Sequence, residues 1–313
     1  MRNTYLDLKI FSKIKILCKI STLSIIILLS SSNHNLYAKD NKSNDTEAEK
    51  KGYEIAKKML DRKSSSSSYN KVILISCDYS EDKTGKRSCR AGKRVKTFES
   101  LGQDQENGNV KKNLSVIIEP AQDQGVSFLQ VDYEKSQKTS DQWIYLPALK
   151  KMKRIVSESG SGPKSGTFFG SELAYEDMEK KHLEDFNSKL IGEDKVDGAN
   201  VWVIEMSPIG QKKSETSYAK SKLWVDKKKD IALKAEVFDK QNRLAKTFYT
   251  KDIKLDKGIW VSHQQIIVNH KNNRMSLMKT MESKINIQFS EQLLSQRSLK
   301  DQDFRNKEMK KIR

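Results

Sequence analysis

Short segments with a period of two recur along most of this chain, and they constrain its fold more than any other feature. In residues 114–119 and 128–133, alternate side chains fall on opposite faces, as in strands that bury one side. Turn sequences follow at intervals of about ten residues, which indicates antiparallel β architecture. Further strands are predicted at residues 72–75, 141–146, 201–206, 222–226, 231–239, 245–255, 260–270 and 275–288.

Helical patterns are fewer. Residues 47–62 carry apolar side chains mainly at three- and four-residue spacing behind a capping Asp45 or Thr46, which predicts an amphipathic helix. Residues 172–190 have looser helical spacing, and a helix start is expected at Ser290. The fold class predicted is mainly antiparallel β with a few helices (α+β), with a long curved sheet whose concave face needs an apolar cover, a ligand included.

The first 38 residues resemble a secretory leader. Five basic residues precede an apolar run of about ten residues, and Ala38 offers a small residue at the cleavage position. The run is short for a membrane span, which needs about twenty apolar residues. We expect a signal peptide over residues 1–38, with an uncleaved anchor as the alternative. A single domain is then expected over residues 39–299, followed by a charged, disordered tail over 300–313.

The chain is basic even without its leader. Removing residues 1–38 changes the balance of basic to acidic residues from 59 against 41 to 54 against 40. Such an excess favours nucleic acid or an anionic membrane surface as a partner. For an exported protein the membrane is favoured and nucleic acid is not expected. The alternative is a lysine-rich background of solvated charges.

Two cysteines, Cys77 and Cys89, remain beyond the leader. An even pair in an exported protein predicts a disulfide, here across a hairpin whose turn contains Thr84-Gly85-Lys86. A metal or redox site is the alternative, although the spacing is not that of a C-x-x-C motif. Neither a metal nor a cofactor is predicted.

Residues 141–178 concentrate unusual features. An aromatic strand with Trp143 and Tyr145 ends at Pro147, and a glycine-rich loop then leads to Phe168 and Phe169. The loop suits either an anion-binding backbone beside Lys164 or a mobile lid that inserts the two phenylalanines into the interior. Four basic residues between strand and loop suit a membrane or an acidic partner, with a solvated hairpin end as the alternative: Lys150, Lys151, Lys153 and Arg154.

Motifs of enzymatic chemistry are missing. The sequence has no P-loop, G-x-G-x-x-G, H-E-x-x-H or G-x-S-x-G motif. The acidic residues Glu172, Glu176, Asp177 and Glu179 are explained equally well by the dipole at a helix start. No enzyme activity is predicted.

The stretch DQWIYLPALKKMKRI followed by GTFFGSELAYEDM resembles the signature of the exported outer-membrane lipoprotein-sorting family (LolA-like). In that family, a W-x-Y-x-P strand leads through basic residues to a G-S-F-x-G-S-x-x-x-Y-x-D block, and Thr167 here replaces the usual serine. The resemblance covers most of residues 50–295. Residues 85–113 and the cysteine pair are less typical. The matching positions are Trp143, Tyr145, Pro147, Arg154, Phe168, Gly170, Ser171, Tyr175 and Asp177.

The resemblance implies a half-open β-barrel whose helices cover an apolar cavity. It also implies a periplasmic carrier of lipid or acylated lipoprotein, sorting it towards the outer membrane. The alternatives are an accessory subunit of an efflux-type inner-membrane transporter, and a hydrolase of envelope polymers in which Glu172 and Asp177 converge. The aromatic residues expected in the cavity or its lid, or otherwise in the core, are Trp143, Tyr145, Phe168, Phe169, Trp202, Trp224 and Trp260.

Overall fold

The structure is a computed structural model that describes residues 34–85, 87–134, 139–157 and 162–313. The predicted signal peptide lies, up to residue 33, outside these residues. The chain divides into two compact units, residues 1–43 and 44–313. The sheet, the insert and the C-terminal helices all belong to the second unit.

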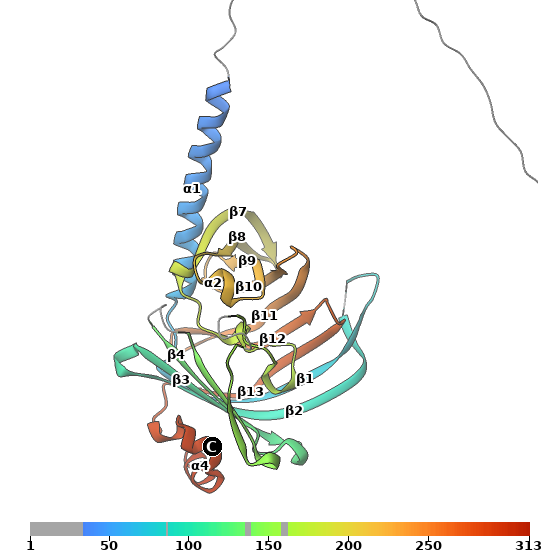
Figure 1. Cartoon of the computed structure of the whole chain (residues 1–313), viewed down its shortest axis with the longest axis vertical. Coiled ribbons are helices and arrows are strands. Elements are labelled where there is room, and N and C mark those ends of the chain that lie inside the picture. The colour runs from blue at the N-terminus through green and yellow to red at the C-terminus, as the bar shows by residue number, and fades with distance from the viewer. Residues whose placement is uncertain (1–33, 86, 135–138, 158–161) are drawn as a thin grey trace, which may run out of the picture. The chain divides into compact units, whose positions relative to one another are not determined.

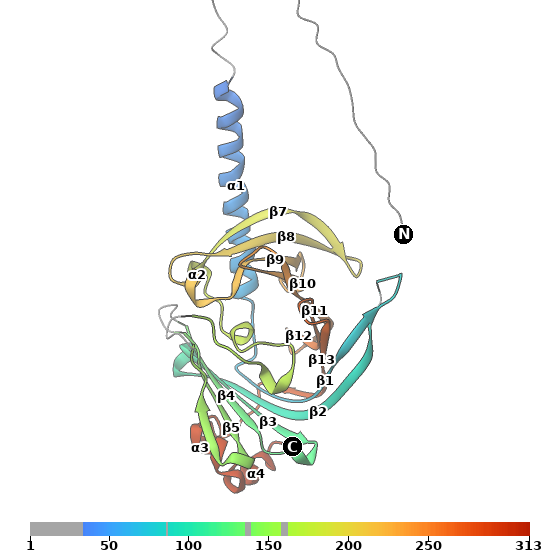
Figure 2. The ribbon, with the colours of Figure 1, turned by 45° about the vertical axis from the view of Figure 1, so that its right-hand side comes forward.

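One antiparallel sheet organises this unit, and in the part of the chain that the structure describes it has thirteen strands. The strand order is β6-β5-β4-β3-β2-β1-β13-β12-β11-β10-β9-β8-β7, so β6 and β7 are the edges and the sheet is not closed. Figure 2 shows the sheet curving around the segment between β6 and β7. The predicted fold class is confirmed. The strands are β1 Ser67–Glu81, β2 Arg87–Gln105, β3 Val110–Glu119, β4 Ser127–Tyr133, β5 Asp141–Leu146, β6 Lys151–Arg154, β7 Phe186–Val196, β8 Ala199–Pro208, β9 Tyr218–Asp226, β10 Ala232–Asp239, β11 Leu244–Asp256, β12 Ile259–Asn269 and β13 Arg274–Ile285.

The inner face of the sheet is the one that contacts residues 162–185, here called the insert. Because side chains alternate across a strand, the register aligns apolar residues of neighbouring strands on this face. Val72 of β1 pairs with Phe98 of β2, which pairs with Ile117 of β3. These side chains form one buried cluster with residues of the insert. The insert contains three 3-10 turns: Phe168–Gly170, Glu176–Met178 and Leu183–Asp185.

The outer face of β1–β5 is also apolar and is covered by the C-terminal segment. Helices α3 (Gln296–Lys300) and α4 (Gln302–Met309) lie below these strands in Figure 1. Leu299 and Met309 are buried against Tyr69 and Leu114. The expectation of a disordered tail over 300–313 is therefore wrong. Most of its charged side chains are exposed, although Arg305 is buried, and its few apolar ones supply the cover that the outer face needs.

Helix α1 runs from His34 to Leu60, so it begins earlier than predicted, and a four-residue helix, α2 (Lys212–Glu215), follows β8. Ile55 and Ala56 of α1 pack on Ile204 and Leu223 at the inner face. Gly52 lets α1 lie close to β7, because a Cβ at residue 52 would lie only 2.6 Å from the Leu190 nitrogen. Among the described helices, none carries an apolar stretch long enough to cross a bilayer.

Two further stretches differ from the sequence-based expectation. Residues 172–190 form turns and then β7 rather than a helix, since their apolar residues contact the sheet from irregular backbone. Residues 85–113, too polar to be predicted as core, include all of β2. Its first half, residues 88–95, is exposed because the β1–β2 hairpin pairs largely with itself, and residues 97–99 are buried.

A disulfide joins Cys77 and Cys89, the predicted pair, across this hairpin, with 5.6 Å between their Cα atoms. It closes a loop of twelve residues in sequence separation. Cross-linking a loop of that length stabilises a fold by about 2–3 kcal/mol, chiefly by restricting the unfolded chain.

The disulfide can be tested by mass. Protein purified without reductant should be about two mass units lighter than the reduced form, because forming the bond removes two hydrogens. Thiol titration of the unfolded, unreduced chain lacking the leader should find no free thiol. Two free thiols in that sample would contradict the bond.

The C-terminal cover can be tested by truncating one buried side chain. Met309→Ala should lower the free energy of unfolding by roughly 2–5 kcal/mol, because a buried methionine is lost from the outer-face cluster. Lys307→Ala, an exposed change on the same helix, is the matched control and should cost under about 0.5 kcal/mol. If urea denaturation gives the same free energy of unfolding for both variants, the tail does not pack on the outer face.

Candidate functional site

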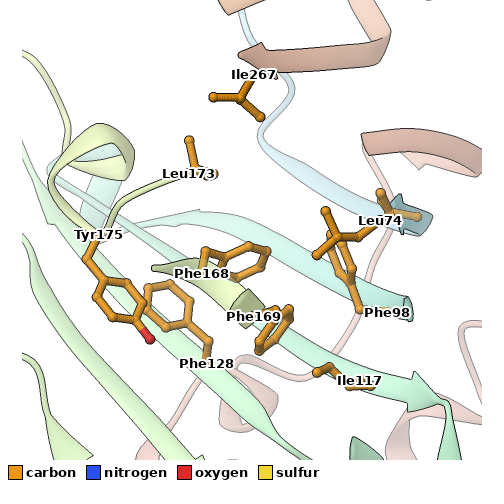
Figure 3. Close-up of a cluster of buried hydrophobic side chains, with 10 residues drawn as sticks. Leu74, Phe98, Ile117, Phe128, Phe168, Phe169, Leu173, Tyr175 and Ile267 are labelled. Carbon is orange, nitrogen blue, oxygen red and sulfur yellow. The ribbon is translucent and has the colours of Figure 1, made fainter. Parts of the chain in front are cut away.

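The insert is held to the inner face by aromatic contacts, which Figure 3 shows. Phe168 and Phe169 are only 3% and 5% exposed. The Phe168 ring lies edge-on to Phe98 and Phe128, with ring centroids 5.5 and 5.3 Å apart. Tyr175 stacks on Phe128 at 5.5 Å. Each such pair adds about 0.5–1.5 kcal/mol beyond its buried area, so these rings anchor the insert.

The backbone of the insert is unusual where it presents these rings. Phe169 has φ 51°, a left-handed conformation that is rare for a bulky residue and costs on the order of 1–3 kcal/mol. Gly166 has φ 96°, and a Cβ there would lie 2.9 Å from the Tyr175 ring. The aromatic packing offsets this strain, so the insert conformation depends on its contact with the sheet.

Polar contacts hold the insert at both ends of the aromatic cluster. The Glu172 carboxylate, 6% exposed as a residue, accepts hydrogen bonds from Asn269 at 2.8 Å, Asn272 at 3.2 Å and Arg274 at 2.8 Å. Its backbone nitrogen donates to Ser276 Oγ at 2.9 Å. Such charge-assisted bonds are about twice as strong as neutral ones, so Glu172 is a structural anchor.

On the neighbouring strands, amide side chains bond carbonyls of the insert. Gln130 donates to the Met178 carbonyl at 2.8 Å, and Gln142 donates to the Tyr175 carbonyl at 3.1 Å. Gln130 also donates to the buried Asp132, whose burial raises the pKa of its carboxyl although hydrogen bonds from Ser140 and Gln130 oppose this. These bonds satisfy backbone groups that an irregular segment would otherwise leave unpaired.

Asp177 joins the insert to strands β9 and β11. Its carboxylate accepts from Tyr218 Oη at 2.7 Å, from Lys246 Nζ at 2.7 Å and from the Ala174 nitrogen at 2.8 Å. Burial and the negative charges of Asp177 and Glu176 raise the pKa of Tyr218 far above its usual value. The tyrosine therefore remains a neutral donor at any physiological pH, and this contact holds the insert to β9 and β11.

Beside this contact, an apolar cavity of about 240 Å³ lies between the insert and strands β7–β12. Its floor comes from inner-face residues of the sheet, and Leu173 of the insert contributes on the opposite side. Charged residues lie around it, mainly from the insert and from α2 and β9. The apolar lining residues are Leu173, Phe186, Met206, Pro208, Leu223, Ala232, Ala235, Val237 and Phe248.

None of the seven aromatic residues predicted for the cavity or lid lines this cavity. Phe168 and Phe169 pack beside it in the inner-face cluster. Trp143 and Tyr145 lie on the outer face beneath the C-terminal segment. These four residues therefore lie outside the lining of this cavity. For Trp143 and Tyr145 the reason is that alternation along a strand sends every second side chain to the other face.

The remaining tryptophans also lie away from the cavity. Trp224 and Trp260 pack in a separate cluster around Val201. Trp224 sits on the face of β9 opposite Leu223, and its indole donates to Asp194 at 3.0 Å. Trp202 lies against the α1 cluster, with the Lys227 ammonium 3.5 Å from its ring centroid.

The four predicted basic residues gather at an edge of the sheet. Lys150 lies in the β5–β6 turn and is exposed, as are Lys151, Lys153 and Arg154. Arg154 pairs with Asp141 of β5. The patch is solvated and available to a partner.

The carboxylates that a hydrolase would need bind separate partners. Glu172 is engaged by Asn269, Asn272 and Arg274, whereas Asp177 is engaged by Tyr218 and Lys246. Within the described part of the chain, no group of three His, Cys, Asp or Glu side chains is placed to hold a metal ion.

Comparisons with known proteins agree on the fold. A domain assigned to the outer-membrane lipoprotein-sorting proteins from Vibrio parahaemolyticus matches with a TM-score of 0.69 and 26% identity, covering 80% of this chain and 99% of that one. A DUF1329 family protein from Desulfovibrio piger matches with a TM-score of 0.68 and 24% identity over the same shares. A LolA superfamily protein from Nitrosomonas europaea matches with a TM-score of 0.54 and 17% identity, again over 80% and 99%.

In sequence, none of the curated proteins matches. A family model described as "-like: Uncharacterized protein" matches residues 109–301, which is more than half of the chain. The predicted resemblance is confirmed by the structural neighbours. The chain thus belongs to the family of uncharacterized proteins that this model describes, and it has the curved-sheet fold of the outer-membrane lipoprotein-sorting (LolA-like) proteins.

Proposed function

We propose that this protein is a periplasmic carrier that binds a lipid, or an acyl chain of a lipoprotein, in the cavity on its inner face. The single observation that carries this proposal is the apolar cavity bounded on one side by the insert. The protein of similar fold from Vibrio parahaemolyticus is named for lipoprotein sorting and not for a catalytic activity, which supports the same reading.

The physical chemistry of such a site needs no reactive residue. Burying an acyl chain gains about 0.8 kcal/mol for each methylene group removed from water. Affinity then comes from shape and from apolar lining, which Met206, Leu223 and Phe248 supply. Release at a destination requires a way to open the site, and the insert is the segment that covers it.

The insert suits a lid because most of its bonds to the sheet are made by side chains and are not part of the backbone hydrogen bonding between strands. It is attached through side chains such as Asp177 and Glu172, and in the described residues its bonds to the sheet use few backbone pairs. Side-chain contacts of this kind can break while the backbone bonds of the sheet remain. The basic edge at Lys150–Arg154 would then face the anionic membrane surface or an inner-membrane transporter.

Filling the cavity tests the carrier directly. Ala235→Phe places a ring in the lining of the cavity and should weaken binding of a fluorescent fatty acid at least tenfold, which corresponds to about 1.4 kcal/mol. Ala91→Phe, the same substitution at an exposed position of the β1–β2 hairpin, should leave the affinity unchanged. Unchanged binding by Ala235→Phe, with a native circular dichroism spectrum, would place any lipid site elsewhere.

The lid is tested by removing one hydroxyl. Tyr218→Phe deletes the 2.7 Å bond to Asp177, and a bond to a charged group is worth about 1.5–3 kcal/mol. Amide exchange in residues 162–185 should accelerate about tenfold or more, while exchange in β1 and β13 stays unchanged. Tyr53→Phe, an exposed tyrosine of α1, is the control. If the insert and these strands accelerate together, the insert is not an independently opening segment.

If no lipid binds the wild-type protein, the alternative is an accessory subunit of an efflux-type inner-membrane transporter, which docks without moving cargo. The observation that favours it is the number of bonds holding the insert over the inner face. Binding measurements on the wild-type protein separate the two roles.

A further inference from the structure

The charged residues around the cavity are matched almost completely within the protein. Glu176 accepts hydrogen bonds from Thr216 Oγ1 at 3.1 Å and from the Ser217 nitrogen at 3.0 Å. Glu179 pairs with Lys164 at 2.7 Å and with Lys212 at 3.1 Å. Asp177 has the three partners described above. Every carboxylate that lines the cavity is therefore already satisfied.

Among the lysines that line the cavity, Lys181 differs from Lys180 and Lys220 in having no carboxylate partner among the described residues. Lys180 pairs with Glu134. Lys220 pairs with Glu205 at 2.9 Å. Lys181 also lines the cavity, yet among the described residues no carboxylate lies within salt-bridge distance of its ammonium and no acceptor bonds it. Its charge is therefore free to pair with another molecule.

The surroundings favour an anion beside that free charge. Lys181 is exposed as a residue and its side chain is open to the cavity, while desolvation by the protein around it lowers the pKa of its ammonium, although Asp177, Glu179 and Glu176 oppose the effect. An ammonium that has no counter-ion in the protein gains a charge pair from an anion placed beside it. The apolar floor next to it accepts hydrocarbon and repels a free hydrated ion.

We propose that the cavity takes a single-chain amphiphile whose anionic head, a carboxylate or a phosphate, pairs with Lys181 while its chain lies on the apolar floor. This inference rests on the proposed carrier function and names its ligand class. The volume agrees with one chain: at about 240 Å³ the cavity is smaller than the roughly 300–1,000 Å³ of sites that enclose drug-sized ligands. A lipid with two or three chains exceeds it in this conformation.

The test compares three ligands of equal chain length by titration calorimetry: decanoate, decyl phosphate and the neutral 1-decanol. Wild-type protein should bind at least one of the two anions tenfold or more tightly than decanol. Lys181→Gln should abolish this preference while binding decanol as before, because only the ion pair is lost. Lys181→Arg should restore the preference. Lys213→Gln removes one charge at an exposed position outside the cavity and should behave as wild type.

The outcomes separate this inference from the function on which it rests. Equal binding of decanol and both anions by wild type, or an undiminished preference in Lys181→Gln, would overturn the role of Lys181 and leave the carrier standing. Absence of binding by all three ligands would overturn both. Tighter binding of decanoate points to a free fatty acid as the source of the head group, and tighter binding of decyl phosphate points to a lysophospholipid.

Discussion

A single open sheet that is apolar on both faces is the constraint on which the rest of this structure depends. Several strands carry apolar side chains on both faces of the sheet. In β3, for example, Leu114 lies on the outer face and Ile117 lies on the inner face. Neither face can be left in water, and the sheet does not close on itself. Three segments outside the sheet therefore cover it: the C-terminal helices on the outer face of β1–β5, and the insert and α1 on the inner face.

The outer-face cover and the insert differ in backbone strain and in the space that they leave, and that difference connects the fold to function. The C-terminal segment buries Leu299 and Met309 against the outer face of β1–β5, and Arg313 pairs there with the buried Glu99 at 2.6 Å. The insert combines the Phe168 and Phe169 rings with buried polar bonds, and it carries a residue with strained backbone. An apolar cavity remains where the insert does not fill the curve of the sheet. The inner cover is thus the one whose displacement would expose a binding surface.

Much of the fold could be predicted from the sequence, because period-two alternation and turn residues encode antiparallel strands locally. The disulfide pair could be predicted from the even number of cysteines in an exported chain, and burial of Phe168 and Phe169 was one of the two interpretations of the glycine-rich loop. The helix expected over 172–190 was wrong because loosely spaced apolar residues fit irregular backbone on a sheet equally well. β2 was missed because half of it projects in a hairpin with solvent on both sides, which removes the apolar alternation.

The site was harder to predict, for a physical reason. A tryptophan on a strand can pack on either face of the sheet, so the face on which Trp143 and Trp224 lie depends on strand neighbours and covering segments that the sequence does not show. The residues that do line the cavity, such as Ala232 and Ala235, are ordinary small strand residues. Their place on the inner face follows from the register with β9, and their exposure to a cavity follows from the path of the insert.

Native mass spectrometry of the wild-type protein, purified from the envelope without added lipid, tests the central claim most directly. A carrier whose inner face binds one acyl chain should retain a single amphiphile in a substantial fraction of molecules. The bound mass should be released by organic extraction and identified as a lipid. A mass equal to that of the polypeptide alone, with no shift after incubation with decanoate, decyl phosphate or a phospholipid, would contradict the account.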